Sequence, residues 1–123
     1  MRREKSAGGY VPPGCWPAEV KYIKDDTSQF GPVVRVGFEI MGTSKHAGVE
    51  VEGLFSATYS ENSKFGKIVK AALEATTAPE SFDDKEMIGG KVALVTKDHV
   101  AKGSTYTKIE DTLPYGAAKD VPF

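Results

Sequence analysis

The sequence predicts an all-β domain that carries one α-helix. Several short segments alternate apolar and polar residues, which is typical of strands with one buried face. Turns rich in glycine and proline separate these segments, and a single segment repeats its apolar residues every three or four positions. A chain of 123 residues is the size of one domain rather than two.

The composition fits a globular chain and excludes several classes of protein. Hydrophobic residues make up 40% of the chain and aromatic residues 10%, which supplies apolar surface to bury. No run approaches the roughly 18 apolar residues of a membrane span. The single cysteine, Cys15, excludes an internal disulfide framework and a cysteine-based zinc site. Because the N-terminus lacks the apolar segment of a secretory signal, we expect a cytoplasmic protein.

The N-terminal quarter predicts an arm and a first strand. Residues 1–9 combine basic residues with glycines, and we expect a flexible basic arm there. A turn at Pro12-Pro13-Gly14 leads into an alternating strand over residues 16–22. Polar residues 24–29 predict a turn after this strand.

Two further strands follow. Residues 34–40 place Val, Val, Phe and Ile on one face, and Gly37 in their midst predicts a bulge or a sharp bend. A polar linker, residues 42–48, precedes a third alternating strand over residues 49–57.

The periodicity then changes to that of a helix over residues 65–73. Asn62 or Ser63 is a suitable N-cap for this helix. Its opposite face carries a row of lysines that we expect to be solvated, namely Lys64, Lys67 and Lys70. Residues 76–86 form an acidic loop after the helix.

The C-terminal third predicts two strands and a tail. A fourth strand over residues 91–96 and a fifth over residues 104–110 are joined by a hairpin loop at 97–103, and residues 112–123 form the tail. Three strands, a helix and two strands are the order of a five-stranded Greek-key barrel with its helix between strands three and four, the OB-fold. We therefore expect an OB-fold domain over residues 10–111; a split barrel of the SH3 type is the alternative, although it does not usually hold a helix there.

Signals for catalysis are weak. The two histidines, His46 and His99, lie in predicted loops without a second metal ligand at helical spacing. The pair Gly90-Lys91 lacks the other residues of a phosphate-binding loop, and Cys15 has no base near it in the sequence. We expect a protein that is not an enzyme and needs neither a metal nor a cofactor.

An OB-fold binds its ligands across strands two and three, between the loops that join strands one to two and four to five. Single-stranded nucleic acid needs cations for its phosphates and aromatic rings on which its bases stack. Arg35 is the best single cation, because it points away from the core face of its strand. The acidic residues Glu39, Glu50 and Glu52 on outward faces argue against a strongly basic groove. The predicted contacts are Arg35, Lys21, Lys91, Lys97 and Lys102 for phosphates, with Lys108 a further basic candidate, and Phe30, Trp16, Tyr22 and Tyr106 for bases.

The C-terminus resembles a known protein-binding tip. The last residues are Asp120, Val121, Pro122 and Phe123, and bacterial single-stranded DNA-binding proteins end in an acidic run followed by Asp-Ile-Pro-Phe. The resemblance implies binding of replication and recombination proteins, with the terminal ring in an apolar pocket and its carboxylate on a basic residue. The chain departs from that family at Lys119, which stands where an acid is expected, and in its short linker.

The body resembles small phage-encoded OB-fold proteins of replication modules, over about residues 10–110. The similar stretches are residues 13–18, 30–32, 35–40, 63–73 and 88–92. This resemblance implies an OB-fold that binds single-stranded DNA, and it assigns no contact residue.

We therefore expect a sequence-tolerant single-stranded DNA-binding protein of replication, recombination or repair, without a membrane partner. A domain this small offers a short site, so assembly into a homo-oligomer is a further expectation. Two alternatives remain open: an OB-fold module of a phage or mobile element that binds protein, and a binder of small ligands or oligosaccharides.

Overall fold

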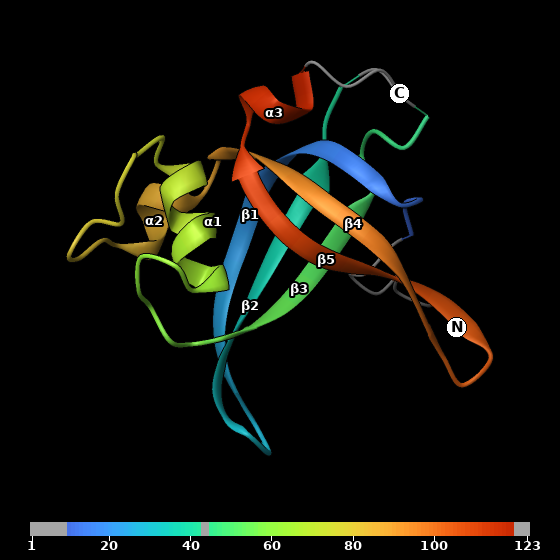
Figure 1. The fold of residues 1–123 in the computed structure, drawn as a ribbon, viewed down its shortest axis with the longest axis horizontal. Helices are drawn as coiled ribbons and strands as arrows, with labels where there is room; N and C mark the ends of the chain where they lie inside the picture. The colour runs from blue at the N-terminus through green and yellow to red at the C-terminus, as the bar shows by residue number, and fades with distance from the viewer. Residues whose placement is uncertain (1–9, 43–44, 120–123) are drawn as a thin grey trace, which may run out of the picture.

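The computed structural model describes residues 10–42 and 45–119 (Figure 1). The strands and helices of this part follow in the order β1 (Gly14–Ser28), β2 (Gly31–Ile40), β3 (Glu50–Ser56), α1 (Lys64–Ala72), α2 (Asp84–Met87), β4 (Lys91–Ala101), β5 (Ser104–Pro114) and α3 (Gly116–Lys119). The prediction of a mostly β domain, with its main helix between the third and fourth strands, is confirmed.

The five strands form one antiparallel sheet in the order β3-β2-β1-β4-β5. β1 is the central strand, because residues 18–28 pair with β2 and residues 14–19 pair with β4. The sheet coils so strongly that β5 crosses close to β3 (Figure 1), and the Ile109 side chain reaches the backbone of Gly53. β3 and β5 nevertheless remain the two edges, so the sheet is not closed.

Both long hairpins extend further than the sequence predicts. Residues 24–28 belong to β1 rather than to a turn, and residues 97–101 belong to β4 rather than to a loop. The reason is that cross-strand pairing satisfies the backbone of these polar segments, which project from the body of the molecule (Figure 1). The turn between β4 and β5 consists only of Lys102 and Gly103, whose φ angles of 53° and 77° match the type I′ turn that suits a twisted hairpin.

The core lies on the inner face of the sheet and is covered at one end by α1. The predicted inward face of β2 is confirmed, since its four apolar side chains are at most 3% exposed. α1 packs against β3, β4 and β5, and its buried residues include Phe65, Ile68 and Val69. Ser63 is the N-cap, and its hydroxyl accepts a hydrogen bond from the Gly66 amide at 2.9 Å.

The irregularity predicted at Gly37 lies instead on the strand opposite. The β1–β2 register shifts between Val20 and Tyr22, so β1 carries the extra residue, and Tyr22 pairs with Gly37. The Tyr22 ring fills the space that a side chain at position 37 would need, because a Cβ there would lie 2.0 Å from its Cε2. A glycine is required at position 37 for this ring to lie against the sheet.

The C-terminal third holds two further differences from the sequence prediction. α2 forms inside the predicted acidic loop, where Asp83 and Glu86 make a reciprocal capping box. β5 continues to Pro114, and Thr112 is only 5% exposed, so the sheet extends past the predicted start of the tail. No helix in the described ranges has the length and apolar character needed to cross a membrane.

Candidate nucleic-acid interface

The outer face of β1, β2 and β3 holds the cation that the sequence ranks first. Strand alternation turns Arg35 outward, and the register places it opposite Lys24 on β1 and Leu54 on β3. Two pairs further along, on the same face, Gly37 lies opposite Glu52, which brings this carboxylate diagonally next to Arg35. We call Tyr22, Asp26, Arg35 and Glu52 the carboxylate network.

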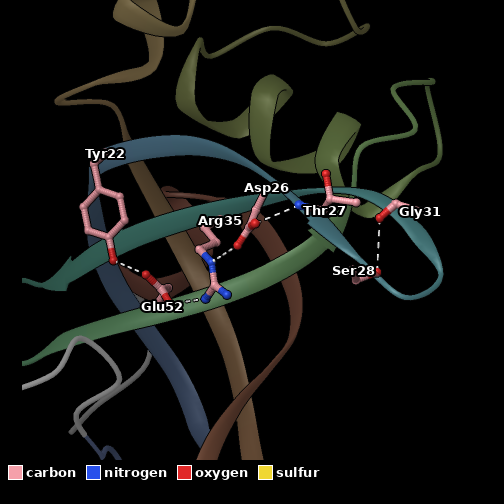
Figure 2. A network of polar contacts seen from close by, with 7 residues as sticks. All are labelled: Tyr22, Asp26, Thr27, Ser28, Gly31, Arg35 and Glu52. Atoms are coloured by element: carbon pink, nitrogen blue, oxygen red, sulfur yellow. Dashed lines mark hydrogen bonds and ion pairs between the residues drawn. The ribbon is translucent and has the colours of Figure 1, made fainter.

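Arg35 is held on two sides within this network (Figure 2). Its Nε donates to Oδ2 of Asp26 at 2.7 Å, and its Nη1 donates to Oε1 of Glu52 at 3.0 Å. These contacts raise the pKa of the Arg35 guanidinium, with Asp26 the larger cause. The same ion pair lowers the pKa of Asp26, which also accepts from the Thr27 amide. Arg35 therefore lies where the sequence predicts, but its charge is compensated by two acids.

Tyr22 completes the network and is not an open stacking platform. Its hydroxyl donates to Oε2 of Glu52, its ring lies against Gly37, and the Lys24 ammonium is 4.9 Å from the ring centroid. Burial, followed by the contact with Glu52, raises the pKa of Tyr22 to about 12. The phenol is therefore a neutral donor at physiological pH and anchors Glu52.

Three other predicted contacts are also engaged inside the chain. Lys21 pairs with Glu19 at 3.3 Å and with Glu39 at 3.6 Å. Lys97 pairs with Glu110 at 3.0 Å, which lowers the pKa of that carboxyl. Trp16 is 5% exposed, and its indole Nε1 donates to the Pro12 carbonyl at 2.9 Å. Trp16 is a core residue with no open ring face, so we remove it from the predicted interface.

A groove of about 490 Å³ lies between the two sheet edges, and we call it the seam groove. β3 and β5 form its two walls, and α1 and β4 each contribute one side chain. Its lining residues are Glu52, Gly53, Leu54, Phe55, Ser56, Lys64, His99, Tyr106, Thr107, Lys108 and Ile109. Phe55 and Ile109 are buried, whereas Leu54 is 51% and Tyr106 49% exposed. The groove thus joins apolar surface to one half-exposed aromatic ring.

The seam groove carries two lysines that are available to bind an anion. Lys64 and Lys108 are exposed, and neither has a carboxylate within 4.0 Å among the residues that the structure describes. Both contribute to the lowered pKa of the nearby Glu110 carboxyl, after the larger effect of Lys97. Glu52 is the acid of the lining, and it is already bound to Arg35 and Tyr22.

The remaining predicted contacts are spread over the molecule. Phe30 is 90% exposed at the tip of the β1–β2 hairpin, and Lys102 occupies the tip of the β4–β5 hairpin. Lys91 lies at the other end of β4, with its ammonium 5.8 Å from the centroid of the Tyr115 ring. Of the predicted residues, Tyr106 and the further basic candidate Lys108 line the seam groove.

Sequence reasoning missed the groove because it depends on contacts between distant segments. Lys64 was expected on a solvated helix face together with Lys67 and Lys70. Those two lysines bind Asp111 and Glu61, whereas Lys64 borders the groove from the first turn of α1. The sequence does identify one part of the groove, because Lys108 lies two residues after Tyr106 on the predicted strand over residues 104–110.

The C-terminal residues Asp120, Val121, Pro122 and Phe123 lie outside the described residues, as does the basic arm of residues 1–9. Within the described ranges, no group of three or more His, Cys, Asp or Glu side chains is arranged to hold a metal ion. No family model matches the sequence, and no curated protein matches it significantly.

Proposed function

We propose that this chain is a non-enzymatic, sequence-tolerant single-stranded DNA-binding protein with an OB-fold. The observation that carries the proposal is the seam groove, which combines Lys64, Lys108 and Tyr106 on one surface. Cations that are not ion-paired can follow a phosphate backbone, and a half-exposed ring in the same groove can stack with a base. Apolar Leu54, on the opposite wall, offers a second surface to the same base.

The strand arrangement supports the OB-fold part of the proposal. An OB-fold is a five-stranded, partly open Greek-key barrel. The order β3-β2-β1-β4-β5, with α1 between β3 and β4, agrees with that topology when the barrel is open between β3 and β5. Relative to the sequence prediction, the proposed interface is shifted from the outer face of β2 and β3 toward this opening.

A role in replication, recombination or repair rests on the resemblance of the C-terminal tip. In the proposal, Asp120 to Phe123 bind partner proteins and the seam groove binds DNA. Deleting residues 120–123 is then expected to leave the affinity for DNA unchanged or increased. A large loss of affinity for DNA on deletion would contradict the assignment of partner binding and DNA binding to separate parts of the chain.

The experiment that tests the proposal is a titration of labelled dT oligonucleotide of about 30 bases, followed by fluorescence anisotropy. We expect binding at about 50 mM salt that weakens markedly at about 300 mM, because each phosphate contact releases counterions. A duplex of the same length is the control, and we expect weaker binding to it because its bases are not free to stack. No binding of the single strand at the lower salt concentration would refute the proposal.

A protein-binding module is the second candidate, and one observation favours it. In the described part of the chain, β3 and β5 each pair with a single neighbouring strand and flank the groove as edges. Exposed edges accept an extended peptide as an additional strand. This candidate predicts no salt-dependent binding of DNA and a stable partner protein in pull-down experiments.

A further inference from the structure

We propose that Arg35 is a latent phosphodiester site, which Asp26 and Glu52 occupy until a bound strand exchanges their carboxylates for a backbone phosphate. This inference rests on the proposed function and concerns how the DNA site is extended beyond the seam groove. The step is an exchange of hydrogen-bond partners, so no covalent bond changes and no proton is transferred.

The position of Glu52 is the first argument. Glu52 accepts from Arg35 (Figure 2) and also lines the seam groove, so it lies where the groove meets the carboxylate network. Arg35 pairs across the strands with Leu54, another groove residue. A strand in the groove therefore passes next to two residues that contact or pair with Arg35.

The chemistry of the contacts is the second argument. A guanidinium binds carboxylate and phosphate oxygens through the same fork of donors, so a phosphodiester can replace either acid. The Arg35 side chain is 41% exposed and that of Asp26 is 42% exposed, which leaves the ion pair open to solvent and to a competing anion. Solvent-exposed pairs of this kind exchange partners readily.

The fate of Glu52 after the exchange is the third argument. Its Oε1 accepts from Arg35, whereas its Oε2 accepts from the Tyr22 hydroxyl, so the two contacts use different oxygens. When Arg35 turns to a phosphate, Glu52 keeps its hydrogen bond to Tyr22. The carboxylate then remains anchored against β1 instead of turning toward the incoming strand.

The test compares Glu52→Gln with Glu50→Gln. Both substitutions remove one negative charge from β3, but Glu50 makes no ion pair among the described residues. A glutamine at position 52 can still accept from Tyr22, while it binds Arg35 more weakly because its charge is gone. The probe is the dT oligonucleotide of about 30 bases, titrated over a range of salt concentrations.

We expect Glu52→Gln to tighten binding of the oligonucleotide several-fold at about 50 mM salt, because the incoming phosphate then displaces one carboxylate fewer from Arg35. Arg35→Ala is expected to flatten the slope of log K against log salt by about 0.7, the value of one lost single-strand phosphate contact. Glu50→Gln is expected to leave the affinity nearly unchanged, and Arg35→Ala combined with Glu52→Gln is expected to abolish the gain. Circular dichroism melting of each variant checks that it is folded.

Equal effects of the two glutamine variants, or a gain that persists without Arg35, would overturn the inference while leaving the proposed function intact. Absence of binding by the wild type would refute the proposed function and overturn the inference with it, whether or not Glu52→Gln binds.

Discussion

The outer face of β1, β2 and β3 and the seam groove between β3 and β5 contain similar residues in different states. Each has cations and a tyrosine, and Glu52 belongs to both. On the outer face, Arg35 and Lys21 are bound to acids, and the Tyr22 ring lies against the sheet. In the seam groove, Lys64 and Lys108 are exposed, and the Tyr106 ring is half-exposed.

This difference between the two regions shows that the strand register decides whether a cation is available to a ligand. The register matters more than whether the cation is an arginine or a lysine. Arginine is the better phosphate ligand by its chemistry. The pairing of β1, β2 and β3 nevertheless places an acid on each side of Arg35, whereas Lys108 on the edge strand β5 has a neighbouring strand on one side only. We therefore expect variants in the two regions to have unequal effects on binding.

The largest expected effect comes from the double variant Lys64→Ala with Lys108→Ala. Loss of two phosphate contacts is expected to weaken binding of dT oligonucleotide roughly 65-fold at about 50 mM salt, and to flatten the salt slope by about 1.4. Anisotropy titrations measure both quantities. The matched control is Lys21→Ala with Lys70→Ala, which removes the same charge from lysines that are ion-paired elsewhere. Equal losses of affinity in the two double variants would contradict the claim that the groove lysines bind DNA more strongly than ion-paired lysines do.

Gly37→Ala is expected to disrupt the carboxylate network on the outer face. The new methyl group overlaps the Tyr22 ring, which must move out of its place on β2. We expect a loss of about 1–3 kcal/mol in the free energy of unfolding, which denaturant titration measures. Gly116→Ala is the control, because a Cβ there meets no atom within 4 Å. An equal loss in both variants would contradict the close approach of the Tyr22 ring to Gly37.

Tyr106→Ala is expected to weaken binding about fivefold, the lower end of the range for one stacked base, because half of this side chain is already covered. The salt slope should stay constant, since no charge is removed. Tyr106→Phe retains the ring and is expected to bind as the wild type does. A loss in the Phe variant as large as in the Ala variant would show that the hydroxyl, and not the ring, is recognised.

A further expected effect, which arises only at high pH, is a change of stability due to Tyr22. Its folded-state pKa is raised from 10.0 to about 12, so between these values the folded protein retains a proton that the unfolded chain has lost. The free energy of unfolding should therefore fall as the pH rises from about 10 to about 12. Lysines titrate in the same range of pH. Comparing the free energy of unfolding of the wild type with that of Tyr22→Phe therefore separates the contribution of the Tyr22 phenol from that of the lysines. Parallel curves would contradict the raised pKa.

The sequence predicts much of the fold because strand and helix periodicity are local properties. The inward face of β2, the helix and its Ser63 cap all follow from residues within a few positions of one another. Residues 24–28 and 97–101 are predicted incorrectly because polar composition resembles that of a turn, whereas pairing with a partner strand decides their conformation.

The candidate site is less predictable than the fold. Alternation predicts that Arg35 points outward, and no local pattern shows that Asp26 and Glu52 bind it. The seam groove requires β3, β5 and the first turn of α1 to meet, which is a property of the tertiary structure. Tyr106, with Lys108 two residues along the same strand, is the part of the groove that sequence alone identifies.

The turn at Lys102 and Gly103 has a consequence for the order in which the chain folds. Both residues adopt the left-handed backbone that joins two strands with the shortest connection, so β4 and β5 pair over contacts that are close in sequence. Hairpins of this kind form within about 1–10 μs, before pairings that require long loops to close. We therefore expect β4–β5 to pair early in folding, and the β1–β4 pairing, which joins residues far apart in the sequence, to form later.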